Sequence, residues 1–276
     1  MDVGLVPFLK WAGGKRWLAE RLKAEFDRPF VGYREPFLGS GAVFFRYGPT
    51  PAVLSDMNSE LIDCYRAIAA TPKDVADELS KLELAHTDAF YYEIRGMKLC
   101  GAAERAARFL YLNRTCWNGL YRVNLKGEFN VPRGTKDAIV LPTDDFAAAA
   151  DLLNRATVRV ADFEDSISEA RPGELIFADP PYTVAHNRNG FIKYNQKIFS
   201  WDDQRRLAAA LLAAAKREVR VIVTNADHDD VRELYRDFPS KFSLSRHSVI
   251  AGGSAFRKAT TELLVTNTEL KFGDGA

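Results

Sequence analysis

Short apolar runs that alternate with helical patterns are the feature that most limits how this chain can fold. Runs with the composition of buried strands lie at residues 33–36, 52–55, 157–160, 175–178, 219–224 and 262–266. Between them lie helical patterns, such as 58–70, where Leu61, Tyr65 and Ile68 share one stripe behind Asn58, a suitable N-cap. Buried strands separated by helices are typical of a mostly parallel sheet with helices on both faces. We therefore predict an α/β fold.

The spacing of these strands predicts an insertion. About 100 residues separate the second strand from the third, whereas a crossover between parallel strands needs only about a dozen. We predict a main domain formed by residues 1–70 and 143–276, and an inserted, mostly helical subdomain at 71–142. The insertion ends in a stretch rich in Gly, Asn and Arg, at about 113–134.

The insertion also carries an uneven charge. From Arg95 to Lys136 there are nine basic residues and two acidic ones, although the whole chain has a formal net charge of only +1. Such a segment is suited to a phosphate backbone. An ordinary solvated face is the alternative for a charged run of this kind.

Composition and termini exclude several classes of protein. The three cysteines are widely spaced, none forms a CxxC pair, and there are only four histidines, so we expect no metal site. No apolar run reaches the roughly 18 residues of a membrane helix, and the first residues lack the pattern of a signal peptide. These features predict a soluble, cytoplasmic protein with no membrane partner.

A glycine turn and an aspartate indicate a nucleoside-bearing ligand. The strand at 33–36 runs into Gly39 and Gly41, which allow a tight turn and close approach of a ligand. Asp56 follows the next strand, where a carboxylate can accept hydrogen bonds from ribose hydroxyls. Each feature alone could be an ordinary turn; together they predict a nucleoside site at the carboxyl ends of the strands.

The motif Asp179-Pro-Pro-Tyr182 indicates the chemistry. It follows the predicted strand at 175–178, and its two prolines fix the backbone and lack amide donors. The Pro180 carbonyl is then expected to point outward beside the Asp179 carboxylate. Two such acceptors suit the two hydrogens of an exocyclic amine such as that of adenine, whose lone pair they would free for attack. Tyr182 offers a flat face on which an extruded base could stack.

These motifs resemble those of the Dam-like family of N6-adenine DNA methyltransferases. Besides Asp179-Pro-Pro-Tyr182 and Glu35-Pro-Phe-Leu-Gly-Ser-Gly41, the block 8–15 matches the family's N-terminal cofactor motif, and 113–122 with 127–132 match its DNA-reading hairpin. Residues 189–204 and 252–266 resemble its C-terminal segments. The resemblance implies a Rossmann-like class I methyltransferase sheet with a DNA-recognition subdomain and a β-hairpin at about 113–134. It also implies transfer of a methyl group from S-adenosylmethionine to N6 of a flipped-out adenine in GATC.

The resemblance assigns roles to individual residues. It implies that the catalytic residues are Asp179, Pro180, Pro181 and Tyr182. The implied cofactor contacts are Trp11, Ala12, Gly13, Lys15, Pro36, Phe37, Gly39, Gly41, Asp56, Asp162, Phe163 and Asp179. The implied DNA contacts are Lys10, Arg114, Trp117, Asn118, Leu120, Arg122, Asn130, Arg133 and Lys136. Among these, Trp117 stands where the family inserts an aromatic ring into the base stack, usually a tyrosine. Leu120 and Arg122 stand where the family reads target bases, and arginine is the natural bidentate reader of guanine. Lys10 stands where it reads an outer base. Thr135 and Lys136 replace an Arg-Tyr pair that the family often has after the hairpin.

The resemblance further implies a monomer that acts on double-stranded DNA near the nucleoid, needs no metal, and releases S-adenosylhomocysteine. A companion restriction endonuclease, acting separately, is a further expected partner. Two alternatives stay open: the same chemistry on another target sequence, and a DNA-binding module without catalysis. Enzymes that transfer to N4 of cytosine usually carry Ser in place of Asp179. Transfer to C5 of cytosine needs a cysteine nucleophile, usually in a Pro-Cys pair, and the sequence has no Pro-Cys pair.

Overall fold

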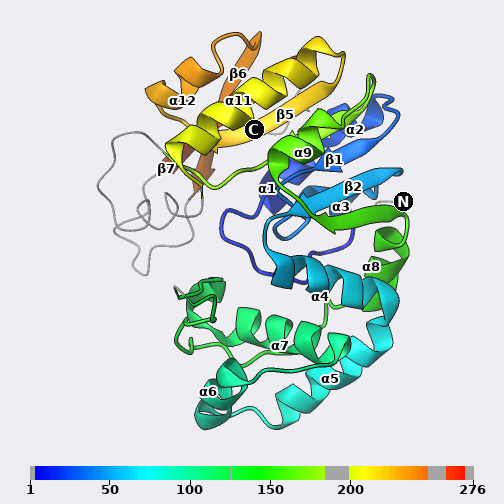
Figure 1. The fold of residues 1–276 in the computed structure, drawn as a ribbon, viewed down its shortest axis with the longest axis vertical. Helices are drawn as coiled ribbons and strands as arrows, with labels where there is room; N and C mark the ends of the chain where they lie inside the picture. Colours follow the sequence, from blue (N-terminus) through cyan, green and yellow to red (C-terminus); the bar gives the residue numbers. More distant parts are fainter. Residues whose placement is uncertain (1–3, 125, 184–198, 248–258, 271–276) are drawn as a thin grey trace. The chain divides into compact units, whose positions relative to one another are not determined.

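The computed structural model describes residues 4–124, 126–183, 199–247 and 259–270 (Figure 1). The chain divides into two compact units. Unit 1 comprises Met1–Lys23 and Leu38–Val160, and unit 2 comprises Ala24–Phe37 and Ala161–Ala276. Of the segments that resemble the family's C-terminal blocks, residues 189–198 and 252–258 lie outside the described residues.

Unit 1 consists of two parallel strands and most of the helices. Its elements are α1 (Arg16–Ala19), η1 (Glu20–Leu22), α3 (Ala42–Tyr47), β2 (Ala52–Asp56), α4 (Ser59–Ala70), α5 (Pro72–Leu84), α6 (Asp88–Gly96), α7 (Ala102–Thr115), η2 (Trp117–Gly119), α8 (Phe146–Leu153) and β3 (Ala156–Val160). Strands β2 and β3 pair in parallel, with Ala52 opposite Ala156. As predicted, the Asn58 side chain caps α4 by accepting a hydrogen bond from the Leu61 amide.

The helices that follow α4 form a layer of their own. Residues 71–142 contain α5, α6, α7 and η2, and α7 packs against α4, α5 and α6 (Figure 1). Buried apolar side chains fill this contact, among them Leu61 and Tyr65 of α4, Leu79 of α5 and Leu110 of α7. This packing supports the segment that follows α7, which carries most of the predicted DNA contacts.

Unit 2 contains the other strands and covers them with helices. Its elements are α2 (Lys23–Asp27, which begins at the unit boundary), β1 (Tyr33–Glu35), α9 (Phe163–Ser168), β4 (Leu175–Ala178), α11 (Trp201–Lys216), β5 (Arg220–Ala226), α12 (Asp229–Leu234), β6 (Ser240–His247) and β7 (Ala259–Thr266). The strand order in this unit is β1-β4-β5-β7-β6. Strands β1, β4 and β5 are parallel, whereas β7 runs antiparallel to both β5 and β6.

The core of unit 2 lies between its strands and the helices α9 and α11. Ile176 of β4, Val221 and Val223 of β5, and Leu207 and Leu211 of α11 are fully buried in one cluster. The N-terminus of α11 carries the expected capping box, in which Ser200 and Asp203 satisfy each other's backbone amides. The capping box therefore fixes the start of helix α11 at Ser200.

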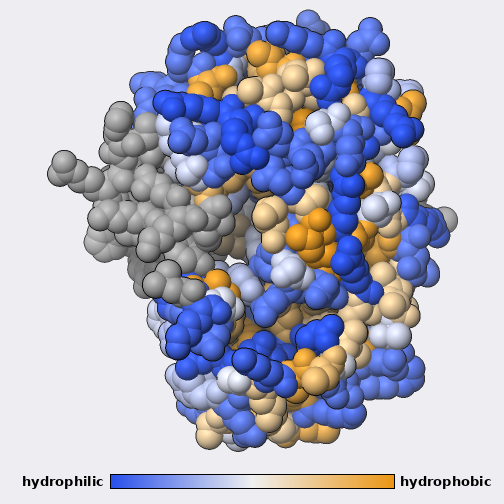
Figure 2. Space-filling model, in the orientation of Figure 1, coloured by the Kyte–Doolittle hydropathy of each residue, from blue (hydrophilic) through white to orange (hydrophobic). Residues whose placement is uncertain are grey.

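The predicted α/β, Rossmann-like fold is confirmed by a mixed sheet of seven strands. All six predicted strands are present, with shifts of one to three residues at some ends. Strand β6 was not predicted, because Leu244 is the one residue classed as buried among residues 240–245, so its sequence lacks a buried-strand pattern. Among the described residues, no helix is long and apolar enough to span a membrane. The face shown in Figure 2 is largely hydrophilic, with scattered apolar patches.

Candidate active site and DNA-contact residues

The predicted glycine turn is tight and is held by backbone contacts in unit 1. Gly39 and Gly41 have positive φ angles of 46° and 63°, and the Gly41 amide donates to the Leu38 carbonyl at 2.7 Å. The Tyr65 hydroxyl donates to the Gly39 carbonyl at 2.8 Å. A Cβ atom at Gly39 would lie 2.8 Å from Cδ1 of Trp11, so only glycine allows the Trp11 ring to approach this turn.

Asp56, the last residue of β2, is tied to the same turn. One carboxylate oxygen accepts from the Gly39 amide at 3.1 Å, and the other accepts from the Asn58 amide at 3.0 Å. Burial raises the pKa of Asp56, and the hydrogen bonds from the Asn58, Gly39 and Met57 amides oppose that shift. The structure therefore brings together Gly39, Trp11 and Asp56, which the sequence had predicted as cofactor contacts from three separate segments.

The N-terminal block folds into a short loop that leads into α1. Gly13 has a φ angle of 81°, and the Gly14 amide donates to the Trp11 carbonyl at 3.0 Å. Lys15 is buried, and its ammonium group donates to the Gly13 carbonyl at 2.7 Å. The Trp11 ring is stacked on the rings of Phe109 and Tyr121, with centroids 6.4 and 5.8 Å away. Ala12 is exposed at the tip of this loop.

In unit 2, an aromatic pair lies at the start of α9. Asp162 caps this helix by accepting from the Glu164 amide at 2.9 Å, and it also accepts from the Arg206 guanidinium. The Phe163 ring is stacked on Phe37, with centroids 5.4 Å apart, and Arg206 lies over the Phe163 ring at 4.8 Å. Pro36 is buried and Phe37 half-buried. Phe163 is only 4% exposed, so the half-buried Phe37 is the more accessible ring of this pair.

The Asp179 motif follows β4 directly, and its two end residues are held by side chains of other strands. The Thr224 hydroxyl of β5 donates to Oδ1 of Asp179 at 2.6 Å. The Tyr182 hydroxyl donates to Oε2 of Glu262, in β7, at 2.8 Å. Burial, followed by the charges of Asp179 and Glu262, raises the pKa of Tyr182 well above its usual value. Tyr182 therefore stays neutral and remains a hydrogen-bond donor.

Buried amide side chains hold the rest of the motif. Gln204 of α11 is fully buried, and it donates to the Pro181 and Thr183 carbonyls at 3.5 and 3.4 Å. Gln204 also exchanges hydrogen bonds with the buried Asn225. Among the described residues, no donor reaches the Pro180 carbonyl. The pair of acceptors at Asp179 and Pro180 stays a prediction.

The predicted hairpin has a shorter base than expected. Asn113, Arg114 and Thr115 belong to α7, and the two arms run from Cys116 to Arg133. They are joined by bridges between Cys116 and Arg133 and between Val123 and Phe129, without a longer ladder among the described residues. A Cβ atom at Gly134 would lie 2.6 Å from the Cys116 carbonyl oxygen, so a glycine is required where the arms close.

Several predicted DNA contacts lie on these arms and are accessible. Trp117 is 51% exposed, and Asn118, next to it, adopts a left-handed conformation with a φ of 55°. The Arg122 guanidinium is exposed and donates to Oδ1 of Asn130 at 2.8 Å. Because the Asn130 amide is neutral, this hydrogen bond does not cancel the charge of Arg122. Leu120 is half-buried.

Lys10 and Lys136 lie near each other in unit 1. The backbone of Lys10 is held by the Asn113 side chain through two hydrogen bonds of 2.9 and 2.7 Å. Burial, and then the charges of Lys136 and Arg114, lower the pKa of Lys10. Lys136 is exposed.

The prediction that Arg114 contacts DNA is wrong. Its side chain is fully buried and forms a bidentate ion pair with Asp144, at 2.6 and 2.7 Å, and it also donates to the Phe8 carbonyl. Arg133 also has acidic partners, since its guanidinium forms ion pairs with both Asp88 and Asp137. Arg114 therefore joins the N-terminal block, α7 and the loop before α8 inside unit 1.

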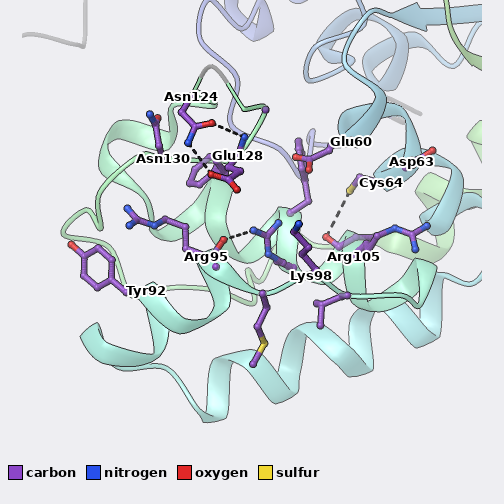
Figure 3. A pocket seen from close by; sticks show the side chains of 18 residues that line it. Glu60, Asp63, Cys64, Tyr92, Arg95, Lys98, Arg105, Asn124, Glu128 and Asn130 are labelled. Atoms are coloured by element: carbon purple, nitrogen blue, oxygen red, sulfur yellow. Dashed lines mark hydrogen bonds between the residues drawn. The ribbon is translucent and has the colours of Figure 1, made fainter.

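The basic segment does not form one uniformly positive face. A cavity of about 540 Å³ in unit 1 is lined by four of its basic side chains, but also by three acidic ones (Figure 3). The basic residues are Arg95, Lys98, Arg105 and Arg108, and the acidic ones are Glu60, Asp63 and Glu128. Glu60 and Asp63 come from α4, outside the segment. Counting charges along the sequence missed these neighbours.

Sequence reasoning missed the residues that support the Asp179 motif. Thr224, Glu262, Gln204 and Asn225 all contact the motif or each other in unit 2. The signal available was the pair of polar residues at the end of the apolar run at 219–224, where a purely structural strand would continue with apolar residues.

Known proteins resemble this chain over almost its whole length. The family profile described as D12 class N6 adenine-specific DNA methyltransferase matches residues 11–250. The chain is 34% identical to the type II methyltransferase M1.LlaDCHI of Lactococcus lactis subsp. cremoris, over 96% of each chain. It is 32% identical to the type II methyltransferase M.MjaIII of Methanocaldococcus jannaschii, over 95% of this chain and 98% of that protein. It is 31% identical to the DNA adenine methylase of Escherichia coli K12, over 93% of each chain.

Proposed function

The chain belongs to the D12 class N6 adenine-specific DNA methyltransferases, and from this premise we propose that it methylates N6 of a flipped-out adenine in duplex DNA, within GATC. The observation that carries the proposal is the Asp179 motif, which follows β4 and is held by Thr224 and Glu262. The E. coli relative named DNA adenine methylase supports adenine as the target base.

We propose S-adenosylmethionine as the methyl donor. It supplies a methyl group made electrophilic by a sulfonium cation, and it leaves as S-adenosylhomocysteine. The residues of unit 1 fit the nucleoside part of this cofactor. Gly39 has no side chain that would clash with the Trp11 ring, and Asp56 presents a carboxylate at the end of β2. Ala12, Gly13, Lys15 and Gly41 would complete this half of the site. In unit 2, we propose Pro36, Phe37, Asp162 and Phe163 as contacts of the adenine ring; Phe37, stacked on the buried Phe163, is the half-buried ring of the pair.

The chemistry follows from two fixed acceptors. Asp179 and the Pro180 carbonyl would accept the two N6 hydrogens of the target adenine, which concentrates the nitrogen lone pair for attack. Thr224 donates to Oδ1 of Asp179 and so fixes how this carboxylate is turned. Pro181 fixes the turn, and the Tyr182 ring would stack on the extruded base. The N6 proton is lost after the transfer, to Asp179 or to water.

The DNA would be held by the insertion and its hairpin arms. The exposed Trp117 is suited to enter the base stack in place of the extruded adenine, and Arg122 to read a guanine edge. Leu120, Asn118, Asn130, Lys10 and Lys136 would contact neighbouring bases or phosphates, with Arg133 contributing between its two ion pairs. In this proposal residues 1–70 and 143–276 form the catalytic domain, and 71–142 the recognition subdomain.

The biological setting is also a proposal. Two relatives are named type II methyltransferases, which supports a companion restriction endonuclease that acts separately on the same sequence. We propose that the enzyme acts as a monomer at the nucleoid, since one copy of the chain contains every site residue that the reaction requires.

The proposed function is tested by methyl transfer to defined duplexes. Purified protein is incubated with S-adenosylmethionine carrying a tritiated methyl group and with duplexes that contain GATC or a permuted site. The variants are Asp179→Ala and, as a matched control, Asp237→Ala, whose side chain is 63% exposed and carries only a surface ion pair. Nucleoside analysis identifies the labelled base.

We expect N6-methyladenine in GATC duplexes alone, its loss with D179A, and wild-type rates with D237A. Equal labelling of permuted duplexes would keep the adenine chemistry and overturn GATC as the target. Labelled cytosine, or no labelled DNA, would overturn the proposed reaction itself.

A further inference from the structure

Two polar side chains of unit 2 lie behind the Asp179 motif on neighbouring strands. Thr224 of β5 is opposite Leu264 of β7, and Ala226 is opposite Glu262. Because paired residues of an antiparallel ladder share a face, Thr224 and Glu262 are diagonal neighbours on one face of the sheet. Both are buried, with exposed fractions of 1% and 5%.

These two side chains each hold one end of the motif by a hydrogen bond. Thr224 donates to Asp179 at 2.6 Å, and Tyr182 donates to Glu262 at 2.8 Å. The Thr224 hydroxyl also lies within hydrogen-bonding reach of the Tyr182 hydroxyl, a contact that opposes the rise in the pKa of Tyr182. Because each hydroxyl has a single hydrogen, given by Thr224 to Asp179 and by Tyr182 to Glu262, these are two separate hydrogen bonds, one at each end of the motif.

We propose that Thr224 and Glu262 are positioning residues for methyl transfer: Thr224 sets the orientation of the Asp179 carboxylate, and Glu262 sets that of the Tyr182 ring. The inference rests on the proposed function, since it assigns these two residues to the same reaction.

The physical reason is that both groups would otherwise rotate. A carboxylate turns about a broad, roughly two-fold torsion, and a tyrosine side chain swings between χ1 rotamers that move its hydroxyl to different places. A hydrogen bond to Oδ1 of Asp179 opposes that rotation. A hydrogen bond from the Tyr182 hydroxyl to a fixed carboxylate holds the far end of the ring. Misplacement of a reacting group by about 1 Å can cost about 100-fold in rate, so small rotations matter here.

The burial of Glu262 supports a specific role. A carboxylate is seldom buried in a strand unless hydrogen bonds or charges satisfy it, and an apolar residue would pack more easily beside the buried Leu264, which shares its face of β7. The register places Glu262 where its side chain meets the Tyr182 hydroxyl, 80 residues away in sequence. Likewise, Thr224 interrupts the apolar run of β5 at the residue that reaches Asp179.

The test uses variants that keep shape and remove single hydroxyl groups. Thr224→Val removes the donor to Asp179, Thr224→Ser restores it, and Tyr182→Phe keeps the ring but removes its bond to Glu262. Glu262→Gln, which keeps an acceptor for the Tyr182 hydroxyl, tests the partner directly. Thr157→Val, at an exposed position of β3, is the matched control. Each full-length protein is assayed for single-turnover methylation at saturating DNA and S-adenosylmethionine, and for the Kd of both.

We expect T224V to lower the single-turnover rate by about 10- to 100-fold, with both Kd values within about threefold of wild type, because alignment and not binding is lost. T224S should recover most of the rate. Y182F should lose about 10-fold, and the pair Y182F/E262Q no more than Y182F alone, since the two residues act through one contact. With 2-aminopurine at the target adenine, Y182F should alter the fluorescence of the extruded base, whereas T157V should not.

The outcomes separate this inference from the proposed function. A wild-type protein that methylates DNA, together with a T224V variant as fast as wild type or a T224S variant as slow as T224V, would overturn the role of Thr224. Independent losses in Y182F and E262Q that multiply in the double variant would overturn the role of Glu262. A wild-type protein that transfers no methyl group to DNA would overturn the proposed function, and the inference with it.

Discussion

Replacement of Asp144 should lower the free energy of unfolding without removing any of the proposed DNA contacts. Asp144 accepts two hydrogen bonds from the Arg114 guanidinium, at 2.6 and 2.7 Å, and the two side chains are only 0% and 6% exposed. In Asp144→Ala the guanidinium would keep its charge in a buried place, with backbone carbonyls such as that of Phe8 as its remaining partners.

The expected loss is large for a single residue. Breaking a buried ion pair by removing one partner costs about 3–5 kcal/mol of the free energy of unfolding. At roughly 2–4 °C per kcal/mol for a chain of this size, the melting temperature should fall by about 6–20 °C. Removing both charges in Arg114→Met/Asp144→Leu should recover most of that loss, because apolar side chains of similar volume can replace a buried pair at little cost.

The assay combines thermal and urea unfolding with fluorescence anisotropy of a labelled duplex at fixed salt. Asp77→Ala is the matched control: Asp77 pairs with Lys73 on the surface, with side chains 54% and 84% exposed, so its loss should leave the melting temperature almost unchanged. A D144A protein with the melting temperature of wild type would refute the reasoning. So would an R114M protein of unchanged stability whose one defect is weaker DNA binding.

Three further predictions concern thiols, the cofactor and base reading. At pH 8, Ellman's reagent should modify the exposed Cys100 quickly and Cys116 slowly. Burial raises the pKa of Cys116 from 9.0 to about 11, which lowers its thiolate population about 100-fold. The variant C100S should lack the fast phase of modification. Asp56→Asn should weaken S-adenosylmethionine binding in calorimetry by about 10-fold or more. Because the pKa of Asp56 is raised in the folded chain, the stability contributed by its titration is lost as the pH rises through that value, so the free energy of unfolding of wild type relative to D56N should fall over that pH range. Arg122→Ala should reduce discrimination between the target duplex and one with an altered guanine by about 1–3 kcal/mol. Lys126→Ala on the same hairpin should weaken binding to these two duplexes alike. Equal effects of the two variants on discrimination would contradict base reading by Arg122.

The strands and caps that could be predicted from sequence are those with local signals. The strand Leu175–Ala178 is an unbroken buried run, and its predicted bounds are the observed ones. Asn58 and Ser200 cap the helices that follow them with hydrogen bonds to amides three residues away. Strand β6 has no such signal, because it is stabilised by the ladder with β7 rather than by burial of its own side chains. Pairing between strands depends on residues distant in sequence, and their pattern cannot be read locally.

The same distinction applies to the candidate site. The motif residues themselves could be predicted, since Asp179, Gly39 and Asp56 lie at the ends of recognisable strands. Their supports could not, since Thr224 lies 45 residues after Asp179 and Glu262 lies 80 residues after Tyr182. A threonine or glutamate in a strand has many ordinary explanations until the register shows which side chain it meets.

Arg114 and Arg122 show why a run of basic residues overstates what is available to DNA. The two have the same side chain and lie eight positions apart, yet Arg114 meets a carboxylate 30 residues further along the chain, whereas Arg122 meets the neutral amide of Asn130. An ion pair with a buried acid cancels the charge of Arg114 and fixes its side chain. Arg114 therefore neither attracts a phosphate nor extends to the surface to contact one. A hydrogen bond to an amide orients the guanidinium while leaving its charge, which is what a base-reading arginine requires. The positive charge that this segment exposes is therefore decided by the acids that fold against it, and not by the number of its arginines and lysines.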